Sequence, residues 1–333
     1  MRVTRDLLLN LAHEQTAKLA AKDNSIQCVY LVGSLLHEAP FLGGVTDVDL
    51  VCVHDRPVKT PREIIRINSD VHLDVAHLSA ETFSPPRRLR LDAWIGGTLD
   101  KGPLVLYDRF HWFDFTRASA ISQFWQTEHT VSRARGFAGR ARKDWLSLSE
   151  EASPQGLKRS QLYLDALANA ANALAVLNGV PLTTRHFMLA LPERMAALNL
   201  NEFTGSFVSL FANESVTSEQ LEKWQTQWEA AYDFVKELPG SPVKFCPTRR
   251  NYYAKAVSVL IADHPAAALW ILATTWCELA AFLPKTESLY KEWQAFMRIL
   301  ELDSKGLPSH LTGLDSLLDN VENTLDGWLE EAA

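Results

Sequence analysis

Two small residues and three aspartates carry the chemistry that can be inferred from this sequence. Gly33 and Ser34 follow an apolar run, Asp47 and Asp49 stand two residues apart beside another, and Asp74 lies between Leu and Val in a third. Free backbone amides and a serine hydroxyl at the start of a helix can bind phosphate. Carboxylates gathered opposite such a turn suit a hard cation such as Mg²⁺. The pattern therefore predicts metal-assisted chemistry on a phosphorylated substrate.

The spacing of the acidic residues predicts that they share one face of a sheet. Side chains two apart on a strand leave the same face, so Asp47 and Asp49 would have Cα atoms about 6.6 Å apart. Asp74 is costly to bury in a strand unless it has a charged partner or a metal. Beside the other two it could share a cation and accept the proton of an attacking hydroxyl.

The surrounding sequence predicts the elements that must position these residues. Up to about residue 114, helical stretches alternate with short β-rich runs at 27–32, 48–53, 71–78 and 104–107, which is an α/β pattern. From about residue 118 onward the helical period dominates, as in the stripe from Leu221 to Leu238 that follows the capping-box spacing of Thr217 and Gln220. We therefore predict an α/β (α+β) domain over 1–115 and an all-α helical-bundle domain over 116–333.

Composition and charge exclude several classes of protein. The 333 residues are 47% hydrophobic and 22% charged, so the chain is neither disordered nor fibrous and is long enough for two domains. Its net charge of −7, from 33 basic and 40 acidic residues, argues against a surface that grips nucleic acid throughout. Residues 87–143 hold 11 basic and 5 acidic side chains, so an anionic ligand near the domain junction would fit.

The cysteines and apolar segments favour a cytoplasmic protein without a membrane partner. The four cysteines, at 28, 52, 246 and 277, lack the spacing of a metal knuckle or a redox pair and are expected to be reduced. The first 20 residues have no continuous apolar core and carry acidic residues, which is typical of an amphipathic helix. The longest uncharged apolar run, 265–277, is too short to span a bilayer.

A basic helix is predicted at the start of the second domain. An apolar stripe runs through residues 134–145, with Arg133 and Arg140 along one border and Arg135 and Arg142 along the other. Arginines in such places can bind phosphate or cover the core with their aliphatic parts. Arg133 and Arg140 are the candidates for nucleotide binding.

Two further polar groups have an ordinary interpretation beside a functional one. Asp165, Asn169 and Asn172 share a helix face and could bind a polyhydroxylated acceptor, although a solvated or interhelical polar stripe is the more common arrangement. Residues 249–253, Arg-Arg-Asn-Tyr-Tyr, suggest a functional role in the same way, but a surface segment is the favoured interpretation.

The ordered motifs resemble the DNA polymerase β-like nucleotidyltransferase superfamily. Gly33, Ser34, Asp47, Asp49 and Asp74 match its signature position by position, and the resemblance covers roughly residues 25 to 110. One difference lies in the spacer 35–46, which lacks the Arg-Gly found in many members and has Thr where they have Ser before the first Asp. The missing arginine leaves the triphosphate contacts open.

The resemblance implies a short mixed sheet and the transfer of a nucleoside monophosphate from an NTP, in the first instance ATP, with pyrophosphate leaving. Two Mg²⁺ ions would be held by Asp47 and Asp49, Asp74 would complete the second metal site and act as base, and Gly33 and Ser34 would hold the phosphates. The helical second domain resembles that of aminoglycoside and other small-molecule nucleotidyltransferases, which implies a small hydroxylated acceptor.

Two alternatives stay open at this point. The acceptor could instead be a protein or a tRNA, as for nucleotidyltransferases of toxin and antitoxin systems, although the overall acidic charge disfavours RNA. The chain could also be a catalytically silent nucleotide-binding module. Some helical domains that accompany small nucleotidyltransferases resemble a family of RNases marked by Arg, four to six residues and then His. An RNase role is rejected, because the only such spacing, Arg66 to His72, lies inside the α/β region.

Overall fold

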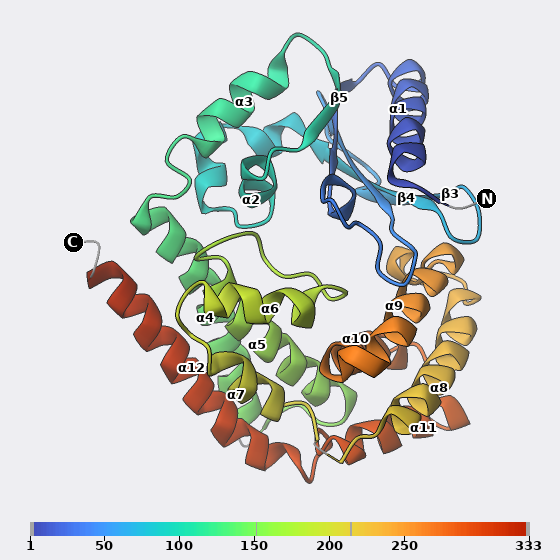
Figure 1. Cartoon of the computed structure of the whole chain (residues 1–333), viewed down its shortest axis with the longest axis vertical. Helices are drawn as coiled ribbons and strands as arrows, with labels where there is room; N and C mark the ends of the chain where they lie inside the picture. The colour runs from blue at the N-terminus through green and yellow to red at the C-terminus, as the bar shows by residue number, and fades with distance from the viewer. Residues whose placement is uncertain (1–2, 151, 214, 331–333) are drawn as a thin grey trace. The chain divides into compact units, whose positions relative to one another are not determined.

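A five-stranded mixed sheet organises the N-terminal part of the chain in the computed structural model, which describes residues 3–150, 152–213 and 215–330. The strand order is β3-β4-β2-β1-β5; β2 and β4 are parallel, and the other neighbouring pairs are antiparallel (Figure 1). The strands are β1 Ile26–Val32, β2 Val48–His54, β3 Arg62–Arg66, β4 His72–Ser79 and β5 Leu104–Asp108.

Four strands agree within one residue with the runs predicted from the sequence, and β3 was not predicted. It is a short edge strand that begins and ends on exposed arginines, Arg62 and Arg66. Charged residues are common on edge strands, because they oppose pairing with further strands, and they hide the apolar pattern by which strands are recognised.

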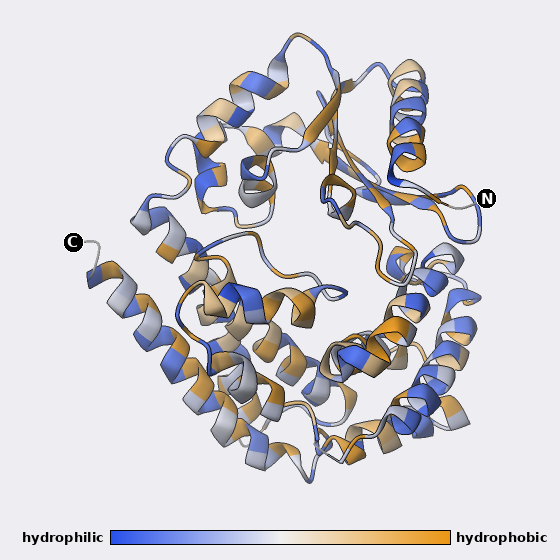
Figure 2. Ribbon diagram, in the orientation of Figure 1, coloured by the Kyte–Doolittle hydropathy of each residue, from blue (hydrophilic) through white to orange (hydrophobic). Residues whose placement is uncertain are grey.

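Helices cover both faces of the sheet, as alternation along β1 requires. Val29 and Leu31 pack toward α1 (Arg5–Lys22), whereas Cys28 and Tyr30 belong to a second apolar cluster on the opposite face. That cluster includes residues of α2 (Ile95–Asp100), α3 (Trp112–Ile121) and the short 3₁₀ segments η2 (Ala80–Phe83) and η3 (Pro86–Leu91). β1 and β5 are correspondingly apolar along most of their length (Figure 2).

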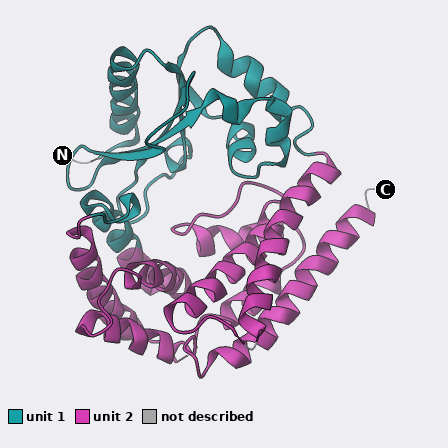
Figure 3. Ribbon diagram, turned by 180° about the vertical axis from the view of Figure 1, so that it is seen from behind, with its two compact units in different colours: residues 1–125, 240–256 teal, residues 126–239, 257–333 magenta. Residues whose placement is uncertain are grey.

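The chain divides into two compact units, each made of two separate stretches of sequence. The first comprises residues 1–125 and 240–256, and the second comprises residues 126–239 and 257–333 (Figure 3). The predicted fold class is confirmed, because an α/β unit with a mixed sheet is combined with a helical unit. Relative to the division predicted at residue 115, the first unit extends ten residues further and also includes a segment from late in the chain.

The second unit is built from helices around buried aromatic side chains. Trp228, Trp270 and Trp276 are at most 1% exposed, and the Trp228 indole donates a hydrogen bond of 2.9 Å to Thr275 Oγ1. The helices beyond residue 125 are α4 Thr127–Ser149, α5 Leu157–Ala175, α6 Phe187–Ala196, α7 Phe203–Ser209, α8 Ser218–Lys236, α9 Arg250–Asp263, α10 Pro265–Ala280, α11 Ser288–Ile299 and α12 Leu307–Glu330, with α9 crossing from the first unit into the second.

Local sequence signals explain where these helices begin and what holds them. The predicted cap of α8 is confirmed, since Thr217 Oγ1 accepts a hydrogen bond from the backbone amide of Gln220. Arg142 of α4 pairs with three carboxylates of α12, which are Asp315, Asp319 and Glu322.

Within the described residues, no helix combines the length and apolar character needed to cross a bilayer.

Candidate active site

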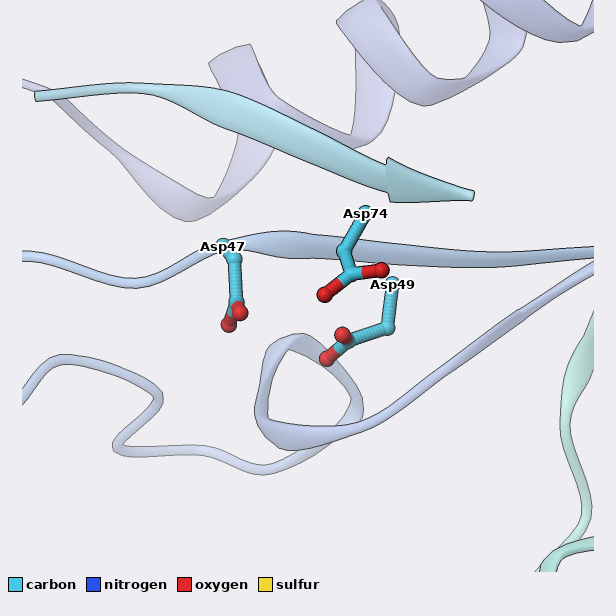
Figure 4. A group of neighbouring side chains, drawn as sticks. All are labelled: Asp47, Asp49 and Asp74. Atoms are coloured by element: carbon cyan, nitrogen blue, oxygen red, sulfur yellow. The ribbon is translucent and has the colours of Figure 1, made fainter. Parts of the chain in front are cut away.

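Strand pairing brings the three predicted carboxylates together. Asp49 of β2 and Asp74 of β4 are directly paired in the parallel register, and Asp47 lies one residue before β2. The three side chains point to the same side of the sheet (Figure 4), and one oxygen of each lies within 4.8 Å of the others. Their side chains alternate with apolar residues such as Leu50, which packs into the core on the opposite face.

The turn after β1 lies directly against this cluster. Asp49 pairs with Val32, the last residue of β1, so its carboxylate reaches the next residue, Gly33. A Cβ atom added at Gly33 would overlap the Asp49 carboxylate, with Asp49 Cγ only 2.9 Å away. Gly33 also has φ 81° and ψ −162°, a conformation essentially restricted to glycine. Glycine is therefore required here both by backbone conformation and by the position of the acid.

Ser34 is at the predicted place, but the helix that it begins is much shorter than expected. Ser34–Leu36 forms a single 3₁₀ turn, η1, so only a small helix dipole is available for an anion. Ser34 Oγ lies 2.6 Å from Thr46 Oγ1, which stands next to Asp47. The two hydroxyls tie the glycine turn to the segment that carries the first carboxylate.

Sequence reasoning missed the closest partner of Asp74. Arg62 of the unpredicted strand β3 donates two hydrogen bonds of 2.6 Å, from Nε to Oδ1 and from Nη2 to Oδ2. The pKa of Arg62 is raised, mainly because of this hydrogen bonding to Asp74. The isolated acid in an apolar strand indicated that a counter-charge was needed, but nothing in the sequence indicated which arginine would supply it.

A second arginine reaches the cluster from residues 240–256. Arg249, at the end of the 3₁₀ turn η5 (Pro247–Arg249), is 8% exposed, so the predicted surface position of this residue is wrong. Its Nη2 lies 3.7 Å from Asp47 Oδ2, and its Nη1 lies 3.5 Å from Asp74 Oδ2. Burial opposes its charge, but nearby Tyr253 and the two carboxylates outweigh burial, and the pKa of Arg249 is raised.

Two tyrosine rings lie near Arg249, and a buried histidine lies near Asp47. The Arg249 guanidinium carbon lies 5.5 Å from the ring centre of Tyr252 and 5.8 Å from that of Tyr253, distances at which a cation is attracted to a π face. His72 is 1% exposed, and its Nε2 lies 3.9 Å from Asp47 Oδ2. The His72 ring meets the Tyr252 ring edge to face, at 5.8 Å between centres.

Asp49 differs electrostatically from its two neighbours. No ion pair or hydrogen bond joins its side chain to any residue in the described part of the chain, whereas Asp47 and Asp74 both lie near Arg249. The pKa of Asp49 is well above its usual value, first because of burial and then because of the two adjacent carboxylates. A carboxylate in this position gains most from a bound cation, which favours its ionised form.

The helical-unit arginines predicted to bind nucleotide have other contacts in the structure. Arg133 is 4% exposed, and its Nη2 donates to Thr130 Oγ1 at 3.2 Å. Arg140 lies over the ring of Phe137, 4.3 Å from its centre, and its Nε donates to Asn169 Oδ1 at 3.4 Å. A phosphate-binding role for either arginine stays a prediction.

Of the polar helix face predicted nearby, Asn172 has a structural role. It is 6% exposed, and its Oδ1 accepts a hydrogen bond of 2.6 Å from the backbone amide of Leu182. Its amide oxygen is therefore engaged in fixing the segment after α5.

Comparisons with known proteins add little to this geometry. No protein-family model matches the chain, and no curated protein matches its sequence. A solved structure described as a nucleotidyltransferase-like protein from Exiguobacterium sibiricum aligns over 95% of this chain and 91% of that one, with 15% identity and a TM-score of 0.31. Because a TM-score of this size does not establish a common fold, the functional proposals rest on the residues of the site.

Proposed function

We propose that the chain is a metal-dependent nucleotidyltransferase. It would transfer a nucleoside monophosphate from an NTP, with ATP the first candidate, to a hydroxyl of a small acceptor and release pyrophosphate. The observation that carries this proposal is the convergence of Asp47, Asp49 and Asp74 against the Gly33-Ser34 turn. Three carboxylates from adjacent strands beside a glycine turn fit the resemblance found in the sequence.

The donor set fits Mg²⁺, which prefers carboxylate oxygens and keeps other positions for water and substrate phosphates. Asp47 and Asp49 would hold the ion, whose charge would stabilise the phosphates during transfer. Ser34 Oγ and the backbone amides of the glycine turn would bind phosphate oxygens. The resemblance makes Asp74 a second-site ligand and a base, but both of its oxygens face guanidinium groups, which weakens that assignment.

The direct test is nucleotide binding measured by isothermal titration with and without Mg²⁺. We expect at least one NTP to bind in a Mg²⁺-dependent way and expect the combined change of Asp47→Asn and Asp49→Asn to weaken binding at least tenfold. Asp55→Asn is the matched control, because it removes an exposed acid just after the other end of β2. Equal binding by the double variant and the control would contradict the proposal.

The acceptor can be identified by incubating the protein with a cell lysate and ATP labelled at the α-phosphate. Label in small hydroxylated compounds is the expected result. Label in protein or tRNA would replace the small acceptor with a macromolecular one. Tight, Mg²⁺-dependent nucleotide binding without pyrophosphate release in any fraction would instead favour a silent nucleotide-binding module.

A further inference from the structure

The three carboxylates of the candidate site are not equally open to a ligand. Both oxygens of Asp74 accept hydrogen bonds from Arg62 at 2.6 Å, and Arg249 Nη1 lies 3.5 Å from Oδ2 of the same residue. A bidentate guanidinium pair uses two of the roughly four acceptor positions of a carboxylate and places a positive charge where it would repel a metal bound to the same group. Among the residues that the structure describes, the Asp49 carboxylate has no ion pair or hydrogen bond, and one of its oxygens lies against the glycine turn.

Arg249 is also held firmly in its place. Its side chain is 9% exposed, bridges Asp47 and Asp74, and lies near the faces of Tyr252 and Tyr253. Swinging it away would leave two almost fully buried carboxylates without one of their counter-charges, and uncompensated buried charge is strongly unfavourable. Arg249 is therefore expected to remain beside the carboxylates when a ligand binds.

The charges of the cluster suit one divalent ion better than two. When a bound cation keeps all three carboxylates ionised, they and the two guanidinium groups leave one net negative charge around Asp47, Asp49 and Asp74. One divalent ion would bring the cluster to a single positive charge. A second ion on Asp74 would share its oxygens with Arg62 and lie close to both guanidinium groups, where like charges repel.

We propose that Arg62 and Arg249 take the place of a second metal ion in this site. One divalent cation is held by Asp47 and Asp49, while Asp74 anchors the two arginines and is not a metal ligand. Arg62 and Arg249 are then positioning residues, which act through the carboxylates. This inference rests on the proposed function, because it concerns the ion that accompanies the nucleotide.

The test is a count of bound Mn²⁺ by electron paramagnetic resonance, in which only free Mn²⁺ gives the sharp six-line signal. The protein is mixed with an equimolar amount of ATP analogue that has a methylene group between the α- and β-phosphorus atoms, and Mn²⁺ is titrated into the complex. We expect one Mn²⁺ per complex for the wild type and two for the variant with Arg62→Ala and Arg249→Ala. Arg66→Ala, which removes an exposed arginine from the same strand, should leave the count at one.

The variant with Arg62→Lys and Arg249→Lys separates charge from packing. It keeps both positive charges and should also bind one ion, whereas a count of two would overturn the proposal. A count of two in the wild type would overturn it as well, while leaving the proposed function intact. If the double alanine variant keeps a cooperative thermal transition but still binds one ion, the arginines do not displace a metal and the proposal is wrong. If that variant does not fold, the numbers of Mn²⁺ ions bound by the wild type and by the lysine variant decide whether the proposal holds. Failure of the wild type to bind the nucleotide analogue would count against the proposed function itself.

Discussion

Replacing Gly33 with alanine should disable the site while leaving the fold largely intact. The added Cβ would overlap the Asp49 carboxylate, and the backbone at Gly33 would be strained at φ 81° and ψ −162°. Strain of this kind costs about 1–3 kcal/mol. The Asp49 side chain can relieve the overlap by rotating about its own bonds, but rotation displaces its oxygens from their present positions beside those of Asp47 and Asp74.

The expected functional loss follows from that displacement. A catalytic or binding group misplaced by about 1 Å can cost about 10²-fold, which corresponds to about 2.7 kcal/mol. Gly44→Ala is the control, because Gly44 also has a positive φ, 73°, but an added Cβ would meet nothing within 4 Å. It should cost about 1–2 kcal/mol of stability from backbone strain alone and should leave Mg²⁺-dependent nucleotide affinity unchanged.

The two variants are compared by chemical unfolding and by titration with Mg-ATP. Gly33→Ala should lose affinity about 100-fold relative to Gly44→Ala, although their stabilities differ by no more than about 2 kcal/mol. Affinities within twofold of each other would refute the reasoning, because the Asp49 carboxylate would then not need the space beside the turn.

Three further changes test other parts of the structure. The pKa of Asp49 is raised in the folded state, so its contribution to stability is fully present only below about pH 3.9, the usual pKa of the group, and is lost as the pH rises through the raised pKa. Asp49→Asn should therefore raise the melting temperature of the metal-free protein at pH 7 and remove the response of that temperature to Mg²⁺. A lower melting temperature would contradict this. Arg142→Ala should lower the free energy of unfolding by about 1–2 kcal/mol, a modest loss because the three carboxylates of α12 that it pairs with are partly exposed. Hydrogen exchange in residues 307–330 should become faster. Unchanged exchange would show that apolar packing alone holds α12. Thr217→Ala should cost about 1 kcal/mol through loss of the α8 cap, measured by denaturant unfolding, whereas Thr217→Ser should be nearly neutral.

Much of the sheet and of the acidic cluster could be predicted from local patterns. The apolar runs of β1, β2, β4 and β5 are bounded by polar residues, glycine or proline, and period-two alternation placed Asp49 on the face opposite Val48 and Leu50. Because Asp47 and Asp49 are close in sequence, their common orientation follows from strand geometry alone. Their meeting with Asp74 depends on the register of β2 and β4, which the structure shows; the resemblance implied only that a third acid lies on a later strand.

The counter-charges could not be predicted in this way. Arg62 lies on an edge strand with no clear apolar pattern, and Arg249 is separated from Asp74 by more than half of the chain. Both contacts are set by tertiary packing, to which the sequence offers no periodic signal. The short η1 turn was also missed, because Leu35 and Leu36 suit a longer helix as well as a single turn.

The late return of residues 240–256 to the first unit affects how this protein is made and dissected. A ribosome must synthesise the sheet and then α4 to α8 before it reaches Arg249. Until then, the nascent acidic cluster lacks one of its two cationic partners. An expression clone that stops after the last strand would have the same defect, so fragments should be designed with this segment grafted back.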